Sequence, residues 1–495
     1  MIPPESSLDQ LQTRTPTMSQ ATVILITLVL YKIVLVGIGL WAQRRTDTNA
    51  DFFLAGRQLG PVVAAISYAA SSSSAWTLLG VSGAAFTLGI SAAWLVPGIL
   101  ACHVACWFGL APKLLHMSTS QNLITLTDVL VADAKDEQRR RLAFTAAIIV
   151  LVAFVFYVAS QFQAAGNTFA SNFDLSMLEA VTLGGVIVMI YTLLGGFWAV
   201  SVTDTLQGLL MAASAVVLPT AAFVAVGGLD GLVQGLADVS TPAQLSLTAG
   251  NAGLLGLGFI VGMCSVGLGT FGQPQLLTRF MALRDTRALK QARIIALSWF
   301  VVVFVGMLLL GWCGHVLMSE VTNGETVFFL LTNELFPPVV AGIILAAVLS
   351  AIMSTADSQL LVAASAVAHD MGLARHRPGS ELWISRAVIA LICLLAIVLA
   401  VAMPAAIFSR VLFAWTGLGA AFGPIVIARV IGWDLKPGYV LSAMVIGFGL
   451  TAIIHALPPT PGAVAERVIP FFVASMIVLA GRVRQTGSQV SPETV

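Results

Sequence analysis

The chain has 495 residues, of which 58% are hydrophobic and only 9% are charged. Soluble domains carry about 45–50% apolar and about 25% charged residues, so this composition excludes an ordinary water-soluble protein and indicates a chain that resides in lipid. A formal net charge of +1 without a sustained basic face gives no reason to expect nucleic acid as a partner.

Apolar stretches of about 20 residues, the length that crosses a bilayer as a helix, recur along nearly the whole chain. They do not alternate polar and apolar residues as the strands of a barrel do. The fold class that we predict is an all-α polytopic membrane protein with about thirteen transmembrane helices. The expected spans are 21–42, 61–87, 92–114, 143–165, 177–197, 203–226, 251–275, 294–318, 337–368, 383–403, 410–431, 437–457 and 465–482.

Basic residues predict how the helices are oriented. Twenty of the 24 Lys and Arg residues lie in or beside the gaps that follow odd-numbered spans, the exceptions being Arg14, Lys32, Arg410 and Arg467. The positive-inside rule places these gaps in the cytoplasm. We therefore expect a multi-pass protein of the cell membrane with its N-terminus outside and its C-terminus in the cytoplasm.

The start of the chain has no basic segment and no cleavage site of a signal peptide, so 21–42 is predicted to be an uncleaved anchor. Met18 is an alternative start to Met1. Lys32 lies near the middle of this span, where an ammonium group is costly. Snorkelling of its side chain toward the interface is the expected explanation, and the sequence assigns Lys32 no functional role.

Two spans dilute their apolar run with small and polar residues. The second reads ASSSSAW at 70–76, and the seventh reads GMCSVGLG at 262–269. Interrupted spans at matching places predict an inverted repeat. The expected organisation is a tail, first helix and cytoplasmic loop in 1–60, a first repeat of helices 2–6 in 61–226, a second repeat of helices 7–11 in 251–431, and two peripheral helices with a short tail in 437–495.

A break in a membrane helix frees carbonyl groups that must find partners in protein, water or an ion. Sodium is a hard cation that prefers oxygen ligands. At 70–74 we expect unwound carbonyls that face the bundle centre, helped by the serine hydroxyls, with Trp76 forming one wall. Close packing of helices through small residues is the alternative.

The ninth span favours a site over packing. Ala351, Ser354, Thr355 and Ser358 recur at i, i+3, i+4 and i+7 on one helical stripe, and Asp357 lies at its edge. Three hydroxyl groups and a carboxylate in an apolar span are costly unless they face a cavity or a partner. Packing alone would be served by alanine or glycine.

Asp204, at the start of the sixth span, is the other carboxylate that could enter the bundle. A helix cap near the cytoplasmic surface is its alternative role. If Asp204 and Asp357 are both ionised and point inward, a second cation could lie between them. The alternative that we favour is that Asp357 only forms hydrogen bonds with neighbouring helices.

The chain resembles the sodium:solute symporter family, and within it most closely the sodium/proline symporters. Four ordered motifs carry the resemblance over nearly the whole chain: DFFLAGRQLG at 51–60, GGFWAVSVTDTLQ at 195–207, FGQPQLLTRFM at 271–281 and MSTADSQLL at 353–361. The resemblance implies thirteen helices and the leucine-transporter-type 5+5 inverted repeat, with the second and seventh helices broken.

The resemblance also implies roles for individual residues. Carbonyls of Ala70 and Ser73 would bind sodium together with Ala351, Ser354 and Thr355. Asp204 would support ion coupling or a second cation near Ser354 and Ser358, with Asp357 as a further candidate. The residues expected to bind or border the substrate are Ser72, Ser74, Trp76, Tyr157, Val266 and Thr270.

The chain departs from proline carriers around the substrate. Ser72 stands where they have an aspartate, and Val266 and Thr270 stand where they have aromatic side chains, which changes the shape and polarity of the pocket. Asp357 replaces a hydroxyl residue, although related monocarboxylate and vitamin carriers can have an acid there. Proline or a related amino acid is the best guess for the solute, and a monocarboxylate or vitamin is the alternative.

These observations predict a secondary active sodium/solute symporter and not an enzyme. The sequence has no nucleotide-binding pattern, so a gradient is the expected energy source. Sodium is the expected coupling ion, with no organic cofactor, and the expected partners are a small solute and the lipid bilayer, without an obligate protein partner. Two other hypotheses are a membrane sensor that binds the solute without transport, and proton coupling through Asp204 or Asp357.

Overall fold

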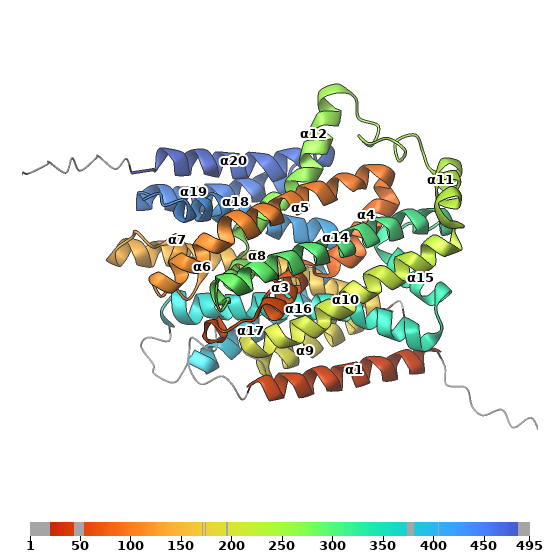
Figure 1. The fold of residues 1–495 in the computed structure, drawn as a ribbon, viewed down its shortest axis with the longest axis horizontal. Helices are drawn as coiled ribbons and strands as arrows, with labels where there is room; N and C mark the ends of the chain where they lie inside the picture. Colours follow the sequence, from red (N-terminus) through yellow and green to blue (C-terminus); the bar gives the residue numbers. More distant parts are fainter. Residues whose placement is uncertain are drawn as a thin grey trace, which may run out of the picture.

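The protein is seen in a computed structural model that describes residues 20–43, 54–170, 172–173, 175–194, 197–373, 381–403 and 405–483. Within these ranges it is a bundle of helices (Figure 1). The described residues form no β-sheet, and their isolated bridges are Leu59–Leu283 and Leu435–Arg482. This agrees with the predicted fold class, because a helix satisfies its own backbone groups in lipid. Met1, Met18 and the C-terminal tail lie outside the described residues.

The first half of the chain contains α1 (Gln20–Gln43), η1 (Ala55–Arg57), α3 (Pro61–Ser72), η2 (Trp76–Gly80), α4 (Val81–Leu88), η3 (Gly89–Trp94), α5 (Leu95–Ala105), η4 (Cys106–Leu110), α6 (Ala111–Ser120), α7 (Leu126–Leu130), α8 (Asp136–Ala170), α9 (Met177–Leu194), α10 (Phe197–Ala225) and α11 (Gly228–Val239).

The second half contains α12 (Gly253–Cys264), η5 (Ser265–Gly272), α13 (Pro274–Ala282), α14 (Thr286–Leu317), η6 (Gly324–Thr326), α15 (Val327–Leu335), α16 (Pro338–Ser365), η7 (Ala366–Asp370), α17 (Glu381–Ala402), α18 (Ile407–Val430), α19 (Pro437–His455), η9 (Pro461–Ala463) and α20 (Val464–Ala480).

Eleven helical stretches among the described residues are long and apolar enough to cross a membrane. Two shorter apolar helices, Pro61–Ser72 and Met177–Ile190, accompany them. The first of these is short because the predicted second span is broken, and the apolar run that follows continues through Trp76–Ser120. A multi-pass membrane protein is therefore confirmed, whereas the count of thirteen transmembrane helices stays a prediction.

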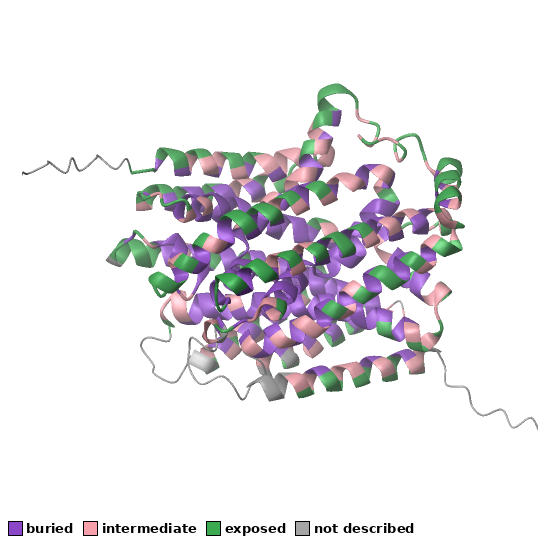
Figure 2. Cartoon of the chain, viewed as in Figure 1, coloured by how far each residue is buried: buried purple, intermediate pink, exposed green. Residues whose placement is uncertain are grey.

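Burial separates central from peripheral helices. In the most apolar window of each helix, 94% of α18 and 83% of α16 are buried, against 17% of α1 and 22% of the stretch that contains α20. Figure 2 shows this as a buried centre surrounded by partly exposed helices, and Figure 1 shows α1 and α20 at opposite edges. The exposed side chains of α1 are mostly apolar, as expected of a face that lipid covers.

Both predicted helix breaks are present. The α-helix of α3 ends at Ser72, and a π-helical turn, η2, leads into α4. Similarly, α12 ends at Cys264, and a 3₁₀ segment through Gly272 leads to α13, which starts at Pro274. The indole of Trp415 in α18 fixes the second break by donating a hydrogen bond from Nε1 to the Val266 carbonyl, at 2.9 Å.

Loops after odd-numbered spans meet at one end of the bundle. The backbone of Leu59 is hydrogen-bonded at 3.1 Å to Ala282 and to Arg284. Asp133, in the gap after the third predicted span, forms an ion pair with Arg429, at the end of the eleventh. These contacts support the prediction that the basic loops share one side of the membrane, and the assignment of that side to the cytoplasm stays a prediction.

The polar gap at 116–141 holds the short helix α7. A capping box starts it, in which Thr125 and Asp128 each accept a hydrogen bond from the backbone N–H of the other. Asp128 also forms ion pairs with Arg139 at 3.0 Å and with His369 at 3.7 Å. Burial acts to raise the pKa of Asp128, but hydrogen bonds from His369 and from the backbone outweigh it and hold the pKa at about 2. Asp128 therefore stays ionised at physiological pH.

We predict that Gly98→Val destabilises the protein, because a Cβ at Gly98 of α5 would lie 2.1 Å from the Cys264 carbonyl oxygen at the second break. Overpacking of this kind costs about 1–3 kcal/mol. The melting temperature of the purified protein in detergent should fall. Gly449→Ala is the matched control, because nothing lies within 4 Å of its added Cβ. Equal melting temperatures for both variants would contradict the close approach of α5 to the break.

Candidate ion and substrate site

The break after α3 is held open by side chains that replace helical hydrogen bonds. Ser73 leaves helical geometry with φ −104° and ψ 64°. Beyond it, the Ala75 N–H donates to Oε1 of Gln161 in α8 at 3.2 Å, and the Ser72 carbonyl accepts from the Trp76 indole at 3.2 Å. Serine side chains compete for backbone groups and weaken a helix, so four in a row favour a break here.

Hydroxyl groups of α16 converge on the carbonyls at the end of α3. Ser354 Oγ lies 3.3 Å from the Ala70 carbonyl oxygen and 3.3 Å from that of Ala351. Thr355 Oγ1 lies 3.3 Å from the Ser71 carbonyl oxygen and 3.5 Å from that of Ala70. All five residues are fully buried. The structure thus brings together four of the five residues predicted to bind sodium.

The fifth predicted ligand, Ser73, lies two residues after Ser71 but does not share the contacts of Ser71 with α16. Among the hydrogen bonds of the described residues, Ser73 makes none to α16, whereas its neighbour Ser71 does. The Ser73 hydroxyl is buried without a partner. A cluster made only of carbonyl and hydroxyl oxygens suits a hard monovalent cation such as sodium. The role of each residue as a ligand stays a prediction.

Asp204 lies in the interior of α10 and is fully buried. Its Oδ2 accepts hydrogen bonds from Ser67 at 2.8 Å, from Ser71 at 3.2 Å and from the Arg279 guanidinium at 3.0 Å. The alternative that Asp204 caps a helix at the membrane surface is therefore wrong. Two turns of α10 precede it, and its carboxylate faces α3 and α13.

Arg279 is a functional candidate that the sequence did not reveal, because its position after a span made it look like one more cytoplasmic charge. It is 1% exposed. From α13, its guanidinium donates to Ser67 Oγ at 3.0 Å, to Ser358 Oγ at 2.6 Å and to the Gln275 carbonyl. A lone basic residue in a motif otherwise free of charge, at 271–281, is the signal that could have indicated it.

The polar network that Arg279 and Asp204 form lies one turn from the oxygen cluster and ties four helices together. Ser71 Oγ lies 2.9 Å from Ser358 Oγ and 3.4 Å from the Ser354 carbonyl oxygen. The network therefore links α3, α10, α13 and α16. Any movement of α3 or α13 would change the environment of the carbonyls at Ala70 and Ser71.

Asp357 is separate from this network. Its Oδ1 accepts a hydrogen bond from Thr192 in α9, and its Oδ2 is buried without a hydrogen-bond partner. The expectation that Asp357 forms a hydrogen bond to a neighbouring helix agrees with the Thr192 contact. Between them, Asp204 and Asp357 place two fully buried carboxyl groups on neighbouring helices.

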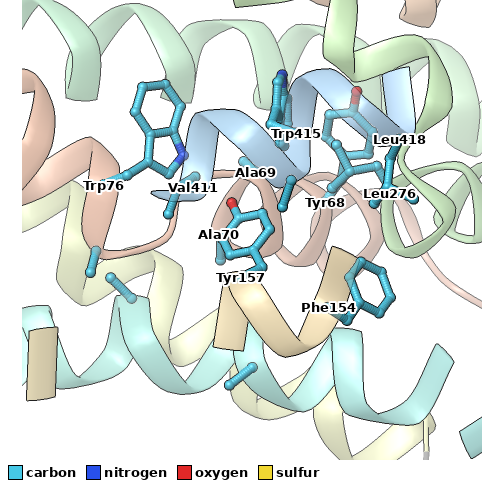
Figure 3. Close-up of a cluster of buried hydrophobic side chains, with 14 of the residues drawn as sticks. Tyr68, Ala69, Ala70, Trp76, Phe154, Tyr157, Leu276, Val411, Trp415 and Leu418 are labelled. Atoms are coloured by element: carbon cyan, nitrogen blue, oxygen red, sulfur yellow. The ribbon is translucent and has the colours of Figure 1, made fainter. Parts of the chain in front are cut away.

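Aromatic side chains lie beside the break. The Tyr157 hydroxyl donates to Ser74 Oγ at 3.4 Å, and Figure 3 shows Tyr157 pointing toward Ala70. The ring of Trp76 lies 6.5 Å from that of Trp415 and 6.1 Å from that of Phe408, measured between centroids. The structure therefore gathers Ser74, Trp76 and Tyr157 as predicted and adds Trp415, which the sequence analysis missed.

Two other predicted substrate residues, Val266 and Thr270, lie in η5 and are buried. The Thr270 hydroxyl is buried without a partner. The Trp415 indole holds Val266 against α18, so Trp415 contacts the second break and also lies near Trp76 beside the first. Ser72 contributes its carbonyl to the Trp76 indole, which orients that ring.

Two neighbouring cavities lie near α7, and the smaller of them also touches α13. A cavity of about 30 Å³ is lined by Pro274 and Thr278 of α13 and by Ser365 of α16. A polar cavity of about 650 Å³ beside Arg139 shares Thr127 and Asp370 with it. The two cavities therefore adjoin each other at Thr127 and Asp370.

Comparison with known proteins matches residues 52–436 to the model of the sodium:solute symporter family. The sodium/proline symporter of Escherichia coli is 35% identical over 453 residues, which is 88% of each chain. The high-affinity proline transporter PutP of Bacillus subtilis is 34% identical over 449 residues, covering 89% of this chain and 93% of the relative. These relatives match the chain nearly end to end.

Among solved structures, a Na⁺-coupled sialic acid symporter in a substrate-bound, outward-open state has a TM-score of 0.75 at 17% identity, covering 93% of this chain and 96% of the neighbour. MhsT in complex with L-phenylalanine has a TM-score of 0.50 at 15% identity, covering 86% and 98%. These neighbours are transporters with the leucine-transporter fold, so the predicted fold class is confirmed.

We predict that Arg279→Met strongly destabilises the protein, because it leaves the Asp204 carboxylate buried without its counter-charge. Breaking a buried ion pair on one side costs about 3–5 kcal/mol. Thermal unfolding of the detergent-solubilised protein should show a large decrease in melting temperature. Arg284→Met is the matched control, because the ion pair of Arg284 with Asp285 is about half exposed. An equal decrease in melting temperature for Arg284→Met would contradict the prediction that the buried Arg279–Asp204 pair contributes more to stability than an exposed pair does.

Proposed function

The chain belongs to the sodium:solute symporter family, and from this premise we propose that it imports a small organic solute together with sodium, with proline as the first candidate. The observation that carries the proposal is the cluster of carbonyl and hydroxyl oxygens shared by the first break and α16. We propose Ala70, Ser73, Ala351, Ser354 and Thr355 as the sodium ligands.

The mechanism that this arrangement supports is alternating access. Sodium bound between the carbonyls at the end of α3 and the hydroxyls of α16 would hold these two helices together and so complete the adjacent substrate site. Loss of sodium would release α3. The small cavity beside α13 and the polar cavity that adjoins it support release toward the basic loops, a side that we propose to be cytoplasmic.

A single coupled sodium ion provides enough free energy. One elementary charge that moves through 100 mV contributes about 2.3 kcal/mol, and about 1.4 kcal/mol corresponds to a tenfold ratio. The membrane potential alone would therefore support more than tenfold accumulation of a neutral solute. The energetics do not require a second sodium ion.

The repeat organisation follows from the same proposal. We infer that 61–226 and 251–431 are the two inverted repeats, because each begins with a broken helix that contributes to the site. The segments 1–60 and 437–495 would then be peripheral. The positions of α1 and α20 at opposite edges of the bundle support this division.

Proline is supported by the similar proteins, which are sodium/proline symporters and proline transporters. We propose Ser72, Ser74, Trp76, Tyr157, Val266 and Thr270 as the substrate-binding residues. A monocarboxylate or vitamin remains the second candidate, because Ser72 and Asp357 differ from the residues expected of proline carriers. The neighbouring Trp76 and Trp415 rings favour a solute with an apolar body in either case.

We predict that Ser354→Ala and Thr355→Ala each raise the sodium concentration needed for half-maximal uptake roughly tenfold, since each removes a buried oxygen from the proposed site. Uptake of labelled proline into proteoliposomes with an imposed sodium gradient measures this. Ser475→Ala in α20 is the matched control, because its hydroxyl contacts only its own helix at Phe471. Unchanged sodium dependence in both variants, or uptake without sodium, would contradict the sodium site.

We predict that unlabelled proline, in roughly tenfold excess over a saturating concentration of labelled proline, lowers uptake of the label about tenfold, and that lactate, pyruvate and pantothenate do not. The physical reason is that a site selects its solute by buried polar partners placed for that solute. If a monocarboxylate competes and proline does not, the second candidate is correct. Saturable binding of proline without counterflow would indicate a sensor instead of a carrier.

A further inference from the structure

Lys32 occupies the centre of a membrane helix, and neither the fold nor the proposed site accounts for it. It is the thirteenth of 24 residues in α1. At 1.5 Å per residue it is about 18 Å from either end of the helix. A lysine side chain is too short to snorkel over that distance, so the expectation that Lys32 reaches the interface is not supported.

The contacts of α1 direct Lys32 toward α16. A Cβ at Gly342 would lie 3.0 Å from Thr27, which shows how closely the two helices approach. Farther along both helices, the Tyr31 hydroxyl is hydrogen-bonded to Ser350, and the Lys32 ammonium contacts the Met353 sulfur. The ammonium therefore lies against α16, inside the bundle edge, and a thioether cannot neutralise it.

Asp357 lies four residues after Met353, on the same face of α16 one turn farther along. Its Oδ2 is fully buried and lacks a hydrogen-bond partner. Among the described residues Lys32 and Asp357 form no direct ion pair within 4.0 Å, but the Met353 contact places the ammonium one helical turn from Asp357. The other groups that face Asp357 are Thr192, Cys393 and Asp204. Of these groups, Lys32 is the one that carries positive charge.

We propose that Lys32 is a tethered cation that neutralises Asp357, and so takes the place that a second coupling ion would otherwise fill beside α16. Each buried carboxylate then has its own resident cation, Arg279 for Asp204 and Lys32 for Asp357. An isolated carboxylate is too costly to keep in this apolar interior, whereas a paired one is tolerated.

The pairing means that α1, although it lies outside the two proposed repeats, supplies a positive charge beside the proposed sodium site. Asp357 is in the same turn of α16 as Ser354 and Thr355, the proposed sodium ligands. A cation delivered by α1 would fix the charge of this turn without a second ion from solution. This consequence rests on the proposed sodium symport, whereas the Lys32–Asp357 pair itself does not.

The pair is tested by a double-mutant cycle on melting temperature in detergent, with Lys32→Met, Asp357→Asn and the double variant. Each single variant should be clearly less stable than the parent, since it leaves one charge unpaired. The double variant should regain most of the loss. Tyr31→Phe, which removes a neutral contact between the same helices, is the matched control, and Asp357→Asn should not rescue it. Additive losses in the Lys32–Asp357 cycle would overturn the pair.

The replacement of an ion is tested on the same purified proteins without any transport step. In Lys32→Met, sodium chloride should raise the melting temperature more than choline chloride does, and more than in the parent, because free sodium can then reach Asp357. Asp357→Asn should remove this extra stabilisation. If sodium stabilises Lys32→Met and the parent equally, the proposed replacement is wrong. Failure of sodium-driven uptake in the parent would instead count against the proposed function alone.

Discussion

The structure depends on one constraint, which is that carbonyl groups freed by the break in α3 must find partners in an interior that has no bulk water. The α16 helix meets this demand with Ser354 and Thr355, whose hydroxyls lie within 3.5 Å of the Ala70 and Ser71 carbonyl oxygens. The cation site that we propose lies where the helix backbone leaves its own carbonyls without helical partners. The break and α16 therefore form one structural unit.

A second constraint is that buried carboxylates need a positive charge nearby. Asp204 and Asp357 are fully buried; Asp204 forms an ion pair with Arg279, and Lys32 is the partner that we propose for Asp357. Arg279 donates to Asp204 of α10 through Nη2 and to Ser67 of α3 through Nε, so α13 and α3 share one polar network with α10. Coupling between sodium and solute in the proposed mechanism would use this network, because it connects the helix before the first break with the helix after the second.

Sequence and structure agree most closely where the signal is local. Helical spacing placed Ser354, Thr355 and Ser358 on one face of α16, and the structure keeps them there against α3. The substrate side agrees less well, because Trp415 and Gln161 come from helices that sequence patterns do not connect with the break. The predicted thirteen spans also compare with eleven long apolar stretches and two shorter apolar helices among the described residues. One of the short helices, Pro61–Ser72, is short because the break divides the second span.

The sequence by itself determined the solvent of the protein, its helical class, the two breaks and the oxygen-rich stripe, because hydropathy, helical period and serine content act over a few residues. Only the tertiary structure decided which charges meet. In the sequence, neither Arg279, which follows a span, nor Lys32, which lies within one, indicates its partner. Folding places Arg279 against Asp204 and places Lys32 against Met353, one helical turn from Asp357. Pairing across helices depends on packing between segments that are far apart in the chain, which no local pattern encodes.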